Sequence, residues 1–171
     1  MSTKVGVVLD DMLDLDFSKV NGLLLTDAEK IPPHIGLVSN GFYYSATANG
    51  TILDRKMTSV LDVIIKKKKK VLFASFDFKL DEEIIRKTFL EYGALVNGKT
   101  CLHPARMCVE KSTGLEFNVN FVFELLPLMQ EQKLISSYHH FSLENHLSER
   151  YYKLPAYTKT DIVACIDRLK R

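Results

Sequence analysis

The sequence lacks the features that mark membrane-spanning and secreted proteins. No apolar run approaches the ~20 residues that span a bilayer. The N-terminal residues show no basic region followed by a long apolar region and a small-residue cleavage site. The chain has only three cysteines, an odd number that argues against a framework of disulfides. We therefore expect a soluble protein without a transmembrane segment, located in the cytoplasm, which is a reducing compartment.

An excess of charge of one sign is also missing, because the formal net charge is only +2. This value is too small to indicate a nucleic-acid partner. The sequence contains no G-x-S-x-G nucleophile elbow. Cys101, His103 and Cys108 lack the paired two-residue spacing of structural zinc sites. We expect no cofactor, no metal ion and no phosphate-binding loop.

The residues that are present form an ordinary globular composition, with 46% hydrophobic and 26% charged residues. A chain of 171 residues is long enough for one buried core. It contains no internal repeat, no low-complexity linker and no shift in composition. These observations predict a single domain over residues 1–171.

One local exception to the balanced charge is a run of five lysines at residues 66–70. Lysines at the end of a helix complement its dipole, so this run is typical of a solvated helix end. The alternative is a patch that docks an anionic partner. We favour the helix end, because the basic patches of nucleic-acid-binding proteins are usually larger and interleaved with aromatic residues.

The clearest local signal is Asn40-Gly41, which separates two β-prone runs at residues 34–39 and 42–47. A type I′ turn needs a positive φ at both central positions, and Asn-Gly adopts this conformation readily. The sequence therefore predicts a tight antiparallel hairpin. Its two-residue loop fixes the register, so that Val38 faces Tyr43 and the pairing continues outward.

Other segments give weaker signals. Residues 115–123 alternate at first like a strand, whereas residues 118–134 also fit a helix interrupted at Pro127, and periodicity does not decide between the two. Asp81 and Gly93 are a natural N-cap and C-terminal stop for one helix, and Thr160 is the cap expected for the last helix. Residues 4–9 are predicted as a short strand or buried run, residues 22–25 as a second apolar patch, and 51–53 and 71–76 as strands. Helices are predicted at 59–65, at 82–92, from a start at or next to Cys101, and from 161 onward.

Cys101 is the candidate nucleophile. Asn97-Gly98 marks a turn, Thr100 is a good cap, and Pro104 is tolerated only in the first turn of a helix. Cys101 is therefore expected at a helix N-terminus, where the dipole favours the thiolate. We predict that its pKa alone among the cysteines is depressed, because Cys108 and Cys165 lie at packing positions of their helices.

A cysteine nucleophile needs a base and a group that orients the base. His34 qualifies as the base, because it begins the first strand of the hairpin. In the register set by Asn40-Gly41, Thr47 lies opposite His34 and Ser45 is its diagonal neighbour on the same face. Either hydroxyl could accept a hydrogen bond from the imidazole.

The order of these residues resembles the circularly permuted papain-like thiol hydrolases, which include bacterial cell-wall amidase-like and lecithin-retinol-acyltransferase-like proteins. The resemblance rests on His34-Ile35-Gly36-Leu37, on the adjacent strand, and on Cys101 at the start of a later helix; it covers roughly residues 31–110. Thr100 and the run after Cys101 depart from the usual pattern. The resemblance implies an α+β fold in which a small antiparallel sheet packs against helices, with Cys101 as nucleophile and His34 as base.

Two functions remain open. The first is a cysteine hydrolase or acyltransferase, of the amidase or peptidase type, that acts on an amide, thioester or ester bond of a small-molecule, peptide or lipid substrate. In this interpretation Thr47 or Ser45 orients His34, and backbone N–H groups beside Cys101 bind the oxyanion. The second is a non-catalytic α+β binding module that docks a protein partner. The sequence specifies neither the substrate nor the oligomeric state.

Overall fold

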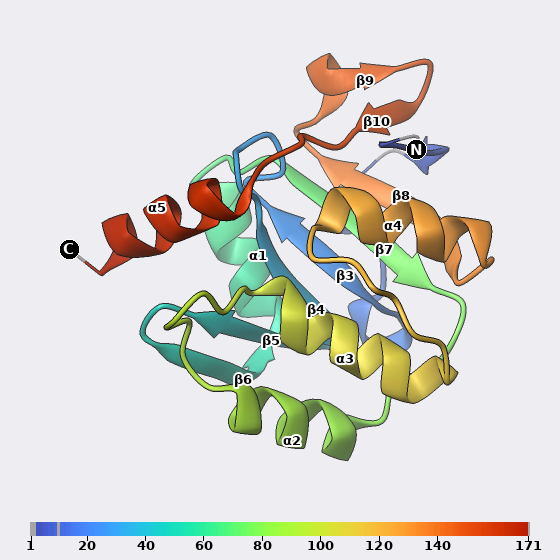
Figure 1. Cartoon of the computed structure of the whole chain (residues 1–171). Helices are drawn as coiled ribbons and strands as arrows, with labels where there is room; N and C mark the ends of the chain where they lie inside the picture. Colours follow the sequence, from blue (N-terminus) through green and yellow to red (C-terminus); the bar gives the residue numbers. More distant parts are fainter. Residues whose placement is uncertain (1–2, 10, 171) are drawn as a thin grey trace.

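The computed structural model describes residues 3–9 and 11–170 of the chain (Figure 1). Within them the helices are α1 (Met57–Lys66), α2 (Glu82–Tyr92), α3 (Leu102–Thr113), α4 (Val122–Glu131) and α5 (Lys159–Leu169), with short 3-10 turns η1 (Met12–Asp14), η2 (Phe17–Lys19) and η3 (Glu144–His146). The strands are β1 (Lys4–Val5), β2 (Val8–Leu9), β3 (Asn21–Thr26), β4 (His34–Ser39), β5 (Phe42–Thr47), β6 (Gly50–Lys56), β7 (Val71–Phe76), β8 (Ile135–Phe141), β9 (Leu147–Ser148) and β10 (Tyr151–Lys153).

The main sheet has the strand order β2-β8-β7-β3-β4-β5-β6. Only β2 runs parallel to its neighbour; all other neighbouring strands in this sheet are antiparallel. A small second sheet has the order β1-β10-β9. The prediction of an α+β fold with an antiparallel sheet is confirmed. No helix in the described part of the chain is both long and apolar enough to cross a membrane.

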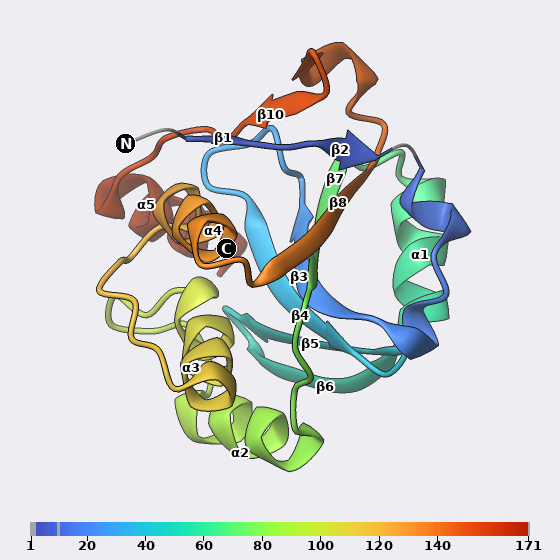
Figure 2. The same ribbon diagram turned by 90° about the vertical axis from the view of Figure 1, so that its right-hand side faces the viewer.

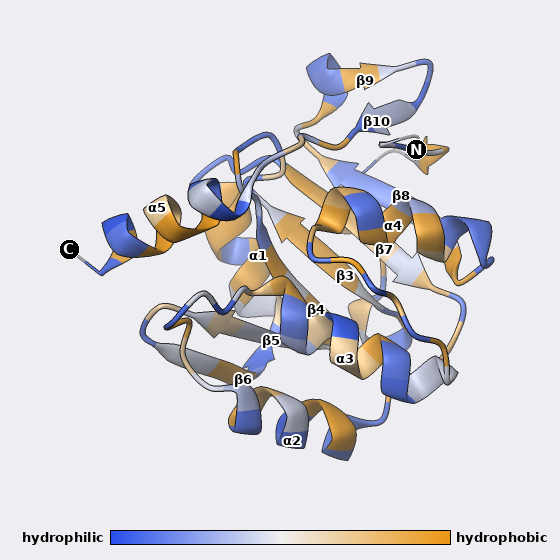
Figure 3. Ribbon diagram, in the orientation of Figure 1, coloured by the Kyte–Doolittle hydropathy of each residue, from blue (hydrophilic) through white to orange (hydrophobic). Residues whose placement is uncertain are grey.

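Helices cover both faces of the main sheet (Figure 2). On one face α2, α3, α4 and α5 enclose the larger core, to which β4 contributes Ile35 and Leu37. On the other face α1, η1 and η2 enclose a smaller core, to which β4 contributes Val38. Figure 3 shows hydrophobic residues concentrated on the central strand β3, while α2 and α3 alternate between hydrophobic and hydrophilic residues. This pattern is the one expected for central strands buried on both faces and helices buried on one.

The predicted hairpin is confirmed as β4 and β5. Asn40 and Gly41 both have a positive φ, of 50° and 82°, as a type I′ turn requires. Val38 pairs with Tyr43, in the predicted register, and the pairing extends as far as Leu37 and Tyr44. Beyond that pair the described backbone shows no further β4–β5 partners, so the hairpin opens at the end where His34 lies.

Glycine at position 36 allows the two strands to pack closely. A Cβ added at Gly36 would overlap the ring of Tyr43 on the neighbouring strand. The ring of Tyr43 is therefore seated directly on the backbone of β4, two residues from His34. A glycine at this point of the His-aliphatic-Gly-aliphatic segment has a steric reason that does not depend on any chemistry at the site.

The helix ends follow local capping rules. The Asp81 carboxylate accepts hydrogen bonds from the backbone N–H groups at the start of α2, and Gly93 ends that helix with a φ of 72°. The cap predicted for the last helix was wrong: Thr158 caps α5, and Thr160 lies inside it. Thr158 and Asp161 exchange side-chain-to-backbone hydrogen bonds, a reciprocal pair that Thr160 has no partner to form.

The ambiguous segment 118–134 contains a helix. Residues up to Phe121 are irregular, and α4 then runs through Pro127 without a break. Pro127 is buried, and its neighbours Leu125 and Leu126 belong to the larger core. The packing of this apolar face outweighs the single backbone hydrogen bond that proline removes.

Candidate functional site

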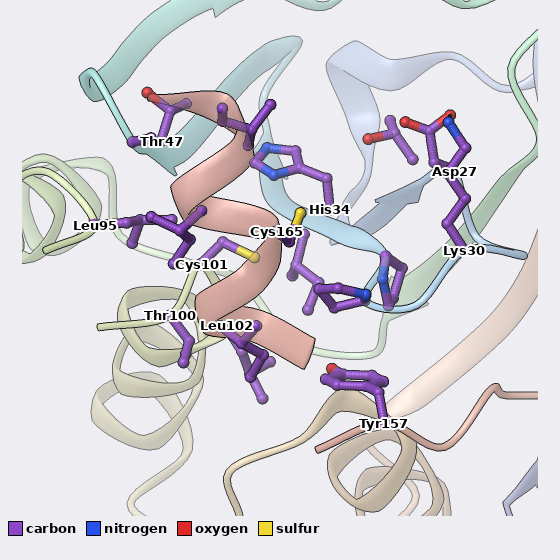
Figure 4. Close-up of a pocket in the computed structure, with 18 of the residues that line it drawn as sticks. Asp27, Lys30, His34, Thr47, Leu95, Thr100, Cys101, Leu102, Tyr157 and Cys165 are labelled. Carbon is purple, nitrogen blue, oxygen red and sulfur yellow. Dashed lines mark ion pairs between the residues drawn. The ribbon is translucent and has the colours of Figure 1, made fainter. Parts of the chain in front are cut away.

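A cavity of about 660 Å³ lies at the open end of the hairpin. Figure 4 shows it between the start of β4, the start of α3 and the length of α5. Both chemistry-bearing residues singled out from the sequence, His34 and Cys101, line this cavity, and Thr47 lines it as well. Residues from three distant parts of the chain therefore converge on one space.

Cys101 stands immediately before α3, as expected, and is partly buried. The prediction that its pKa is depressed was wrong: burial raises the pKa of this thiol to about 11. The backbone N–H groups of Ile35 and Leu102 act in the opposite direction and favour the thiolate. The helix start does assist the thiolate, but desolvation of the sulfur has the larger effect.

His34 is the first residue of β4, and its imidazole is held by Ser45. The Nε2 atom of His34 lies 2.6 Å from the Oγ atom of Ser45, which is fully buried. Burial, together with the positive charge of Lys69, lowers the pKa of His34 to about 4. The imidazole is therefore neutral at physiological pH. Nδ1 is the ring nitrogen that does not contact Ser45.

Of the two hydroxyls proposed to orient His34, the structure places Ser45 against the ring and Thr47 elsewhere. The Thr47 hydroxyl donates to the carbonyl of Gly50 and accepts from the N–H of Asn49, so it stabilises the β5–β6 turn. Tyr43 lies next to Ser45: burial raises the pKa of the Tyr43 phenol, and a hydrogen bond with Ser45 acts against that shift. Tyr43, Ser45 and His34 thus form a connected polar cluster.

His34 and Cys101 reach the cavity from different sides. Side chains alternate along β4, so His34 shares its face with Val38 of the smaller core, whereas Ile35 faces the helices that include α3. Both residues line the same cavity, which lies where the β4–β5 pairing has ended. In the part of the chain that the structure describes, no hydrogen bond joins the Cys101 sulfur to the imidazole.

The loop that leads to Cys101 is attached beside the open end of the hairpin. The Leu95 N–H donates to the Thr47 carbonyl at 2.9 Å, so this loop attaches to the end of β5. The Ile35 N–H faces the Cys101 sulfur from β4. The loop is therefore attached to the end of β5, and the Cys101 thiol lies next to β4, the strand that carries His34.

Helix α5 forms one wall of the cavity through Ile162, Cys165 and Ile166. Among residues 3–9 and 11–170, every hydrogen bond that α5 makes falls within its own turns and N-cap, so only side-chain packing holds it to the rest of the chain. The chain just before it is firmly attached. The ring of Tyr157 packs edge-on against Phe121 and Phe123, with centroids 5.3 and 5.2 Å apart, and its hydroxyl accepts from the Val122 N–H.

The rim of the cavity is charged. Asp27 forms ion pairs with Lys69, at 3.0 Å, and with Lys30, at 3.6 Å. Burial acts to raise the pKa of Asp27, but the two lysines outweigh it and lower the pKa overall. Sequence reasoning missed this cluster, because Asp27 and Lys69 are far apart in the chain and meet only through the packing of neighbouring strands.

The other two cysteines differ from each other. Cys108 is fully buried in the larger core, which confirms the packing role predicted for it, and burial raises its pKa to about 11. The prediction that Cys165 also lies at a core position was wrong. It is only partly buried and lines the cavity near Cys101 (Figure 4).

One sequence pattern was overlooked. Residues 93–100 read Gly-Ala-Leu-Val-Asn-Gly-Lys-Thr, which fits the G-x-x-x-x-G-K-T spacing of phosphate-binding loops. That motif needs a strand before the loop, but this loop follows helix α2. Lys99 donates to the carbonyl of Tyr92 at 2.6 Å and lies over its ring. The loop geometry does not support phosphate binding.

The described residues contain no group of three His, Cys, Asp or Glu side chains placed to hold a metal ion. His103, which is near Cys101 in the sequence, stacks on Tyr92 with ring centroids 5.2 Å apart. No protein-family model, curated protein or solved structure matches this chain.

Proposed function

We propose that the protein is a cysteine hydrolase or acyltransferase of the permuted papain-like kind, with Cys101 as nucleophile and His34 as general base. The observation that carries the proposal is that a single cavity contains a thiol at a helix start and an imidazole whose Nε2 is held by a buried hydroxyl. Nucleophile, base and orienting group are the three parts that thiol acyl transfer needs. Ser45 takes the orienting role, and Thr47 has none.

The reaction begins with both groups neutral. The pKa of Cys101 is about 11 and that of His34 about 4, so at pH 7 the thiol keeps its proton and the imidazole can accept one. His34 removes the thiol proton as the sulfur attacks the carbonyl carbon of an amide, thioester or ester. The N–H groups of Ile35 and Leu102, which already face the sulfur, are placed to stabilise the developing oxyanion.

The remaining steps return the site to its starting state. The imidazolium gives its proton to the departing amine, alcohol or thiol, and the acyl group stays on the Cys101 sulfur as a thioester. Water or a second nucleophile then attacks this thioester with His34 again as the base, and the imidazolium gives the proton it has taken to the departing Cys101 thiolate. Hydrolysis releases a carboxylic acid, and transfer releases a new ester or amide.

A second candidate is a non-catalytic module that uses the same cavity or surface to bind a protein partner. The observation that favours it is the absence of a hydrogen bond between Cys101 and His34 within the described residues, together with a thiol pKa raised rather than lowered. In this interpretation Cys101 is a small half-buried packing residue, and the His34–Ser45 bond satisfies a histidine near the core.

The two candidates are separated by acyl transfer to the enzyme itself. The protein is incubated with a panel of acyl thioesters, activated esters and amides, and the intact mass is measured for an acyl adduct. Wild type is expected to show an adduct mapped to Cys101, and Cys101→Ala to show none. His34→Gln should reduce the acylation rate by about 100-fold or more, because general-base catalysis typically contributes 10²–10⁴-fold.

Two matched variants complete the test. Ser45→Ala should reduce acylation less than His34→Gln, because it removes only the group that holds the ring. Thr47→Val should leave the rate unchanged, since that hydroxyl serves the β5–β6 turn. Circular dichroism checks that each variant is folded. Acylation that survives Cys101→Ala would disprove the thiol mechanism, and the absence of any adduct across the panel would favour the binding module.

A further inference from the structure

The exposed part of the cavity wall carries a surplus of positive charge. Lys30, Lys69 and Arg168 line the cavity, and the Lys30 side chain is 64% exposed. Asp27 is the acid among them, and it already pairs with both lysines. Arg168 forms no ion pair with any residue that the structure describes. The cavity therefore opens through a positively charged rim.

The lysine run at 66–70 extends this charge outward. It forms the end of α1 and the turn into β7, and it is fixed beside the loop at 27–33 by the Lys69–Asp27 ion pair and by a backbone hydrogen bond from Ala28 to Lys70. Lys66, Lys67 and Lys68 are exposed, and none of them pairs with an acid in the described structure. Segments 27–33 and 59–70 together hold six lysines and three acids.

Exposed aliphatic side chains accompany these lysines. Ile31, next to Lys30, is 50% exposed, and Leu169, next to Arg168 on the cavity wall, is 63% exposed. Ile65, next to Lys66, is 47% exposed. Each of these aliphatic residues is therefore a sequence neighbour of a basic one. A purely electrostatic site for a soluble polyanion has no use for large apolar groups held in water.

We propose that this basic and aliphatic rim is a docking surface for an anionic lipid bilayer. The docking surface consists of Lys30, Lys69, Arg168 and Leu169, which line the cavity, and of Ile31, Ile65, Lys66, Lys67 and Lys68, which adjoin Lys30 and Lys69 in the chain. Lysine and arginine are attracted to the negative surface of the bilayer, and aliphatic side chains enter the boundary between head groups and acyl chains. Docking itself does not require the thiol. If the chain docks in this way, the cavity opens toward the membrane and takes its substrate there, and this consequence rests on the proposed function.

The test is co-sedimentation of the full chain with vesicles of phosphatidylcholine alone or with 30% phosphatidylserine, about the proportion that gives a strong surface potential. Wild type is expected to bind the anionic vesicles and to be released by salt. The triple variant K66Q/K67Q/K68Q should bind on the order of 100-fold more weakly, because each lysine near an anionic surface contributes about fivefold. The matched control K79Q/K87Q/K133Q, which removes three exposed lysines elsewhere, should bind like wild type.

The aliphatic contribution is tested separately with Ile31→Ser and Leu169→Ser, which keep the charge unchanged and should also weaken binding. Equal loss in the control triple would show attraction by net charge alone and would overturn the proposal. Failure of the wild type to bind anionic vesicles would also overturn the proposal. The same holds if the wild type binds heparin but not vesicles, and the aliphatic variants bind heparin equally well. Cys101→Ala should bind vesicles normally, so failure of docking and failure of the thiol chemistry are read separately.

Discussion

Acid should destabilise this protein through His34. The imidazole is held neutral in the folded chain, where burial and the nearby charge of Lys69 lower its pKa to about 4. In the unfolded chain the pKa of histidine returns to about 6.5. Between these two values the unfolded chain binds a proton that the folded chain does not, so the free energy of unfolding falls as the pH falls. The contribution is complete above pH 6.5 and is lost toward pH 4.

The size of the effect follows from the two pKa values. Between pH 7.5 and pH 5.0, a shift from 6.5 to about 4 corresponds to a loss of about 2 kcal/mol in the free energy of unfolding. This figure is an upper bound, because the His34 side chain is not completely buried. His34→Gln keeps a polar group beside Ser45 but cannot titrate, so it should lack this part of the pH dependence.

The measurement is urea unfolding of wild type and His34→Gln at both pH values. Other groups titrate equally in the two proteins, so the difference between their pH dependences isolates His34. His146→Gln, at an exposed histidine, is the matched control and should keep the wild-type dependence. If wild type and His34→Gln lose the same stability on acidification, within about 0.5 kcal/mol, then burial does not hold His34 neutral and the argument fails.

Gly36→Ala should lower the free energy of unfolding by about 1–3 kcal/mol, because the added Cβ overlaps the Tyr43 ring. The loss should be smaller in a Tyr43→Leu background. Thermal melts that show the same loss in both backgrounds would contradict this reason. Thr158→Ala should destabilise the N-terminus of α5 by about 1 kcal/mol, because it removes the N-cap. NMR chemical shifts of the first turn should show fraying in this variant but not in Thr160→Ala. Equal fraying in both variants would show that the capping box does not start the helix.

Local sequence rules predicted the parts of the fold that local forces determine. Asn40-Gly41 gave the hairpin and its register, because backbone conformation alone selects that turn. Asp81 and Gly93 gave both ends of α2 for the same reason. The last helix was placed correctly but its cap was not, since both Thr158 and Thr160 are acceptable caps and only the partner Asp161 distinguishes them.

The site was predictable only in part. The positions of His34 and Cys101 at the ends of their elements follow from sequence, but their environment does not. The raised pKa of Cys101 comes from burial in a region that α5 covers from the far end of the chain. The choice of Ser45 over Thr47 depends on where β4 and β5 separate, and no local sequence pattern shows that their pairing ends at Leu37 and Tyr44.

The walls of the cavity belong to two units that can unfold separately: helix α5, and the rest of the fold, to which Tyr157 is firmly attached. Tyr157 is clamped by aromatic packing and a hydrogen bond, whereas α5 depends on the burial of Ile162 and Ile166, each worth about 1.5–3 kcal/mol. Release of α5 alone would then cost about 3–6 kcal/mol and leave between roughly one molecule in a hundred and one in twenty thousand open. Native-state hydrogen exchange measures this directly. Amides of α5 should exchange well before those of β3 and β7, so exposure of Cys101 has an equilibrium of its own, set by two isoleucines and independent of global unfolding.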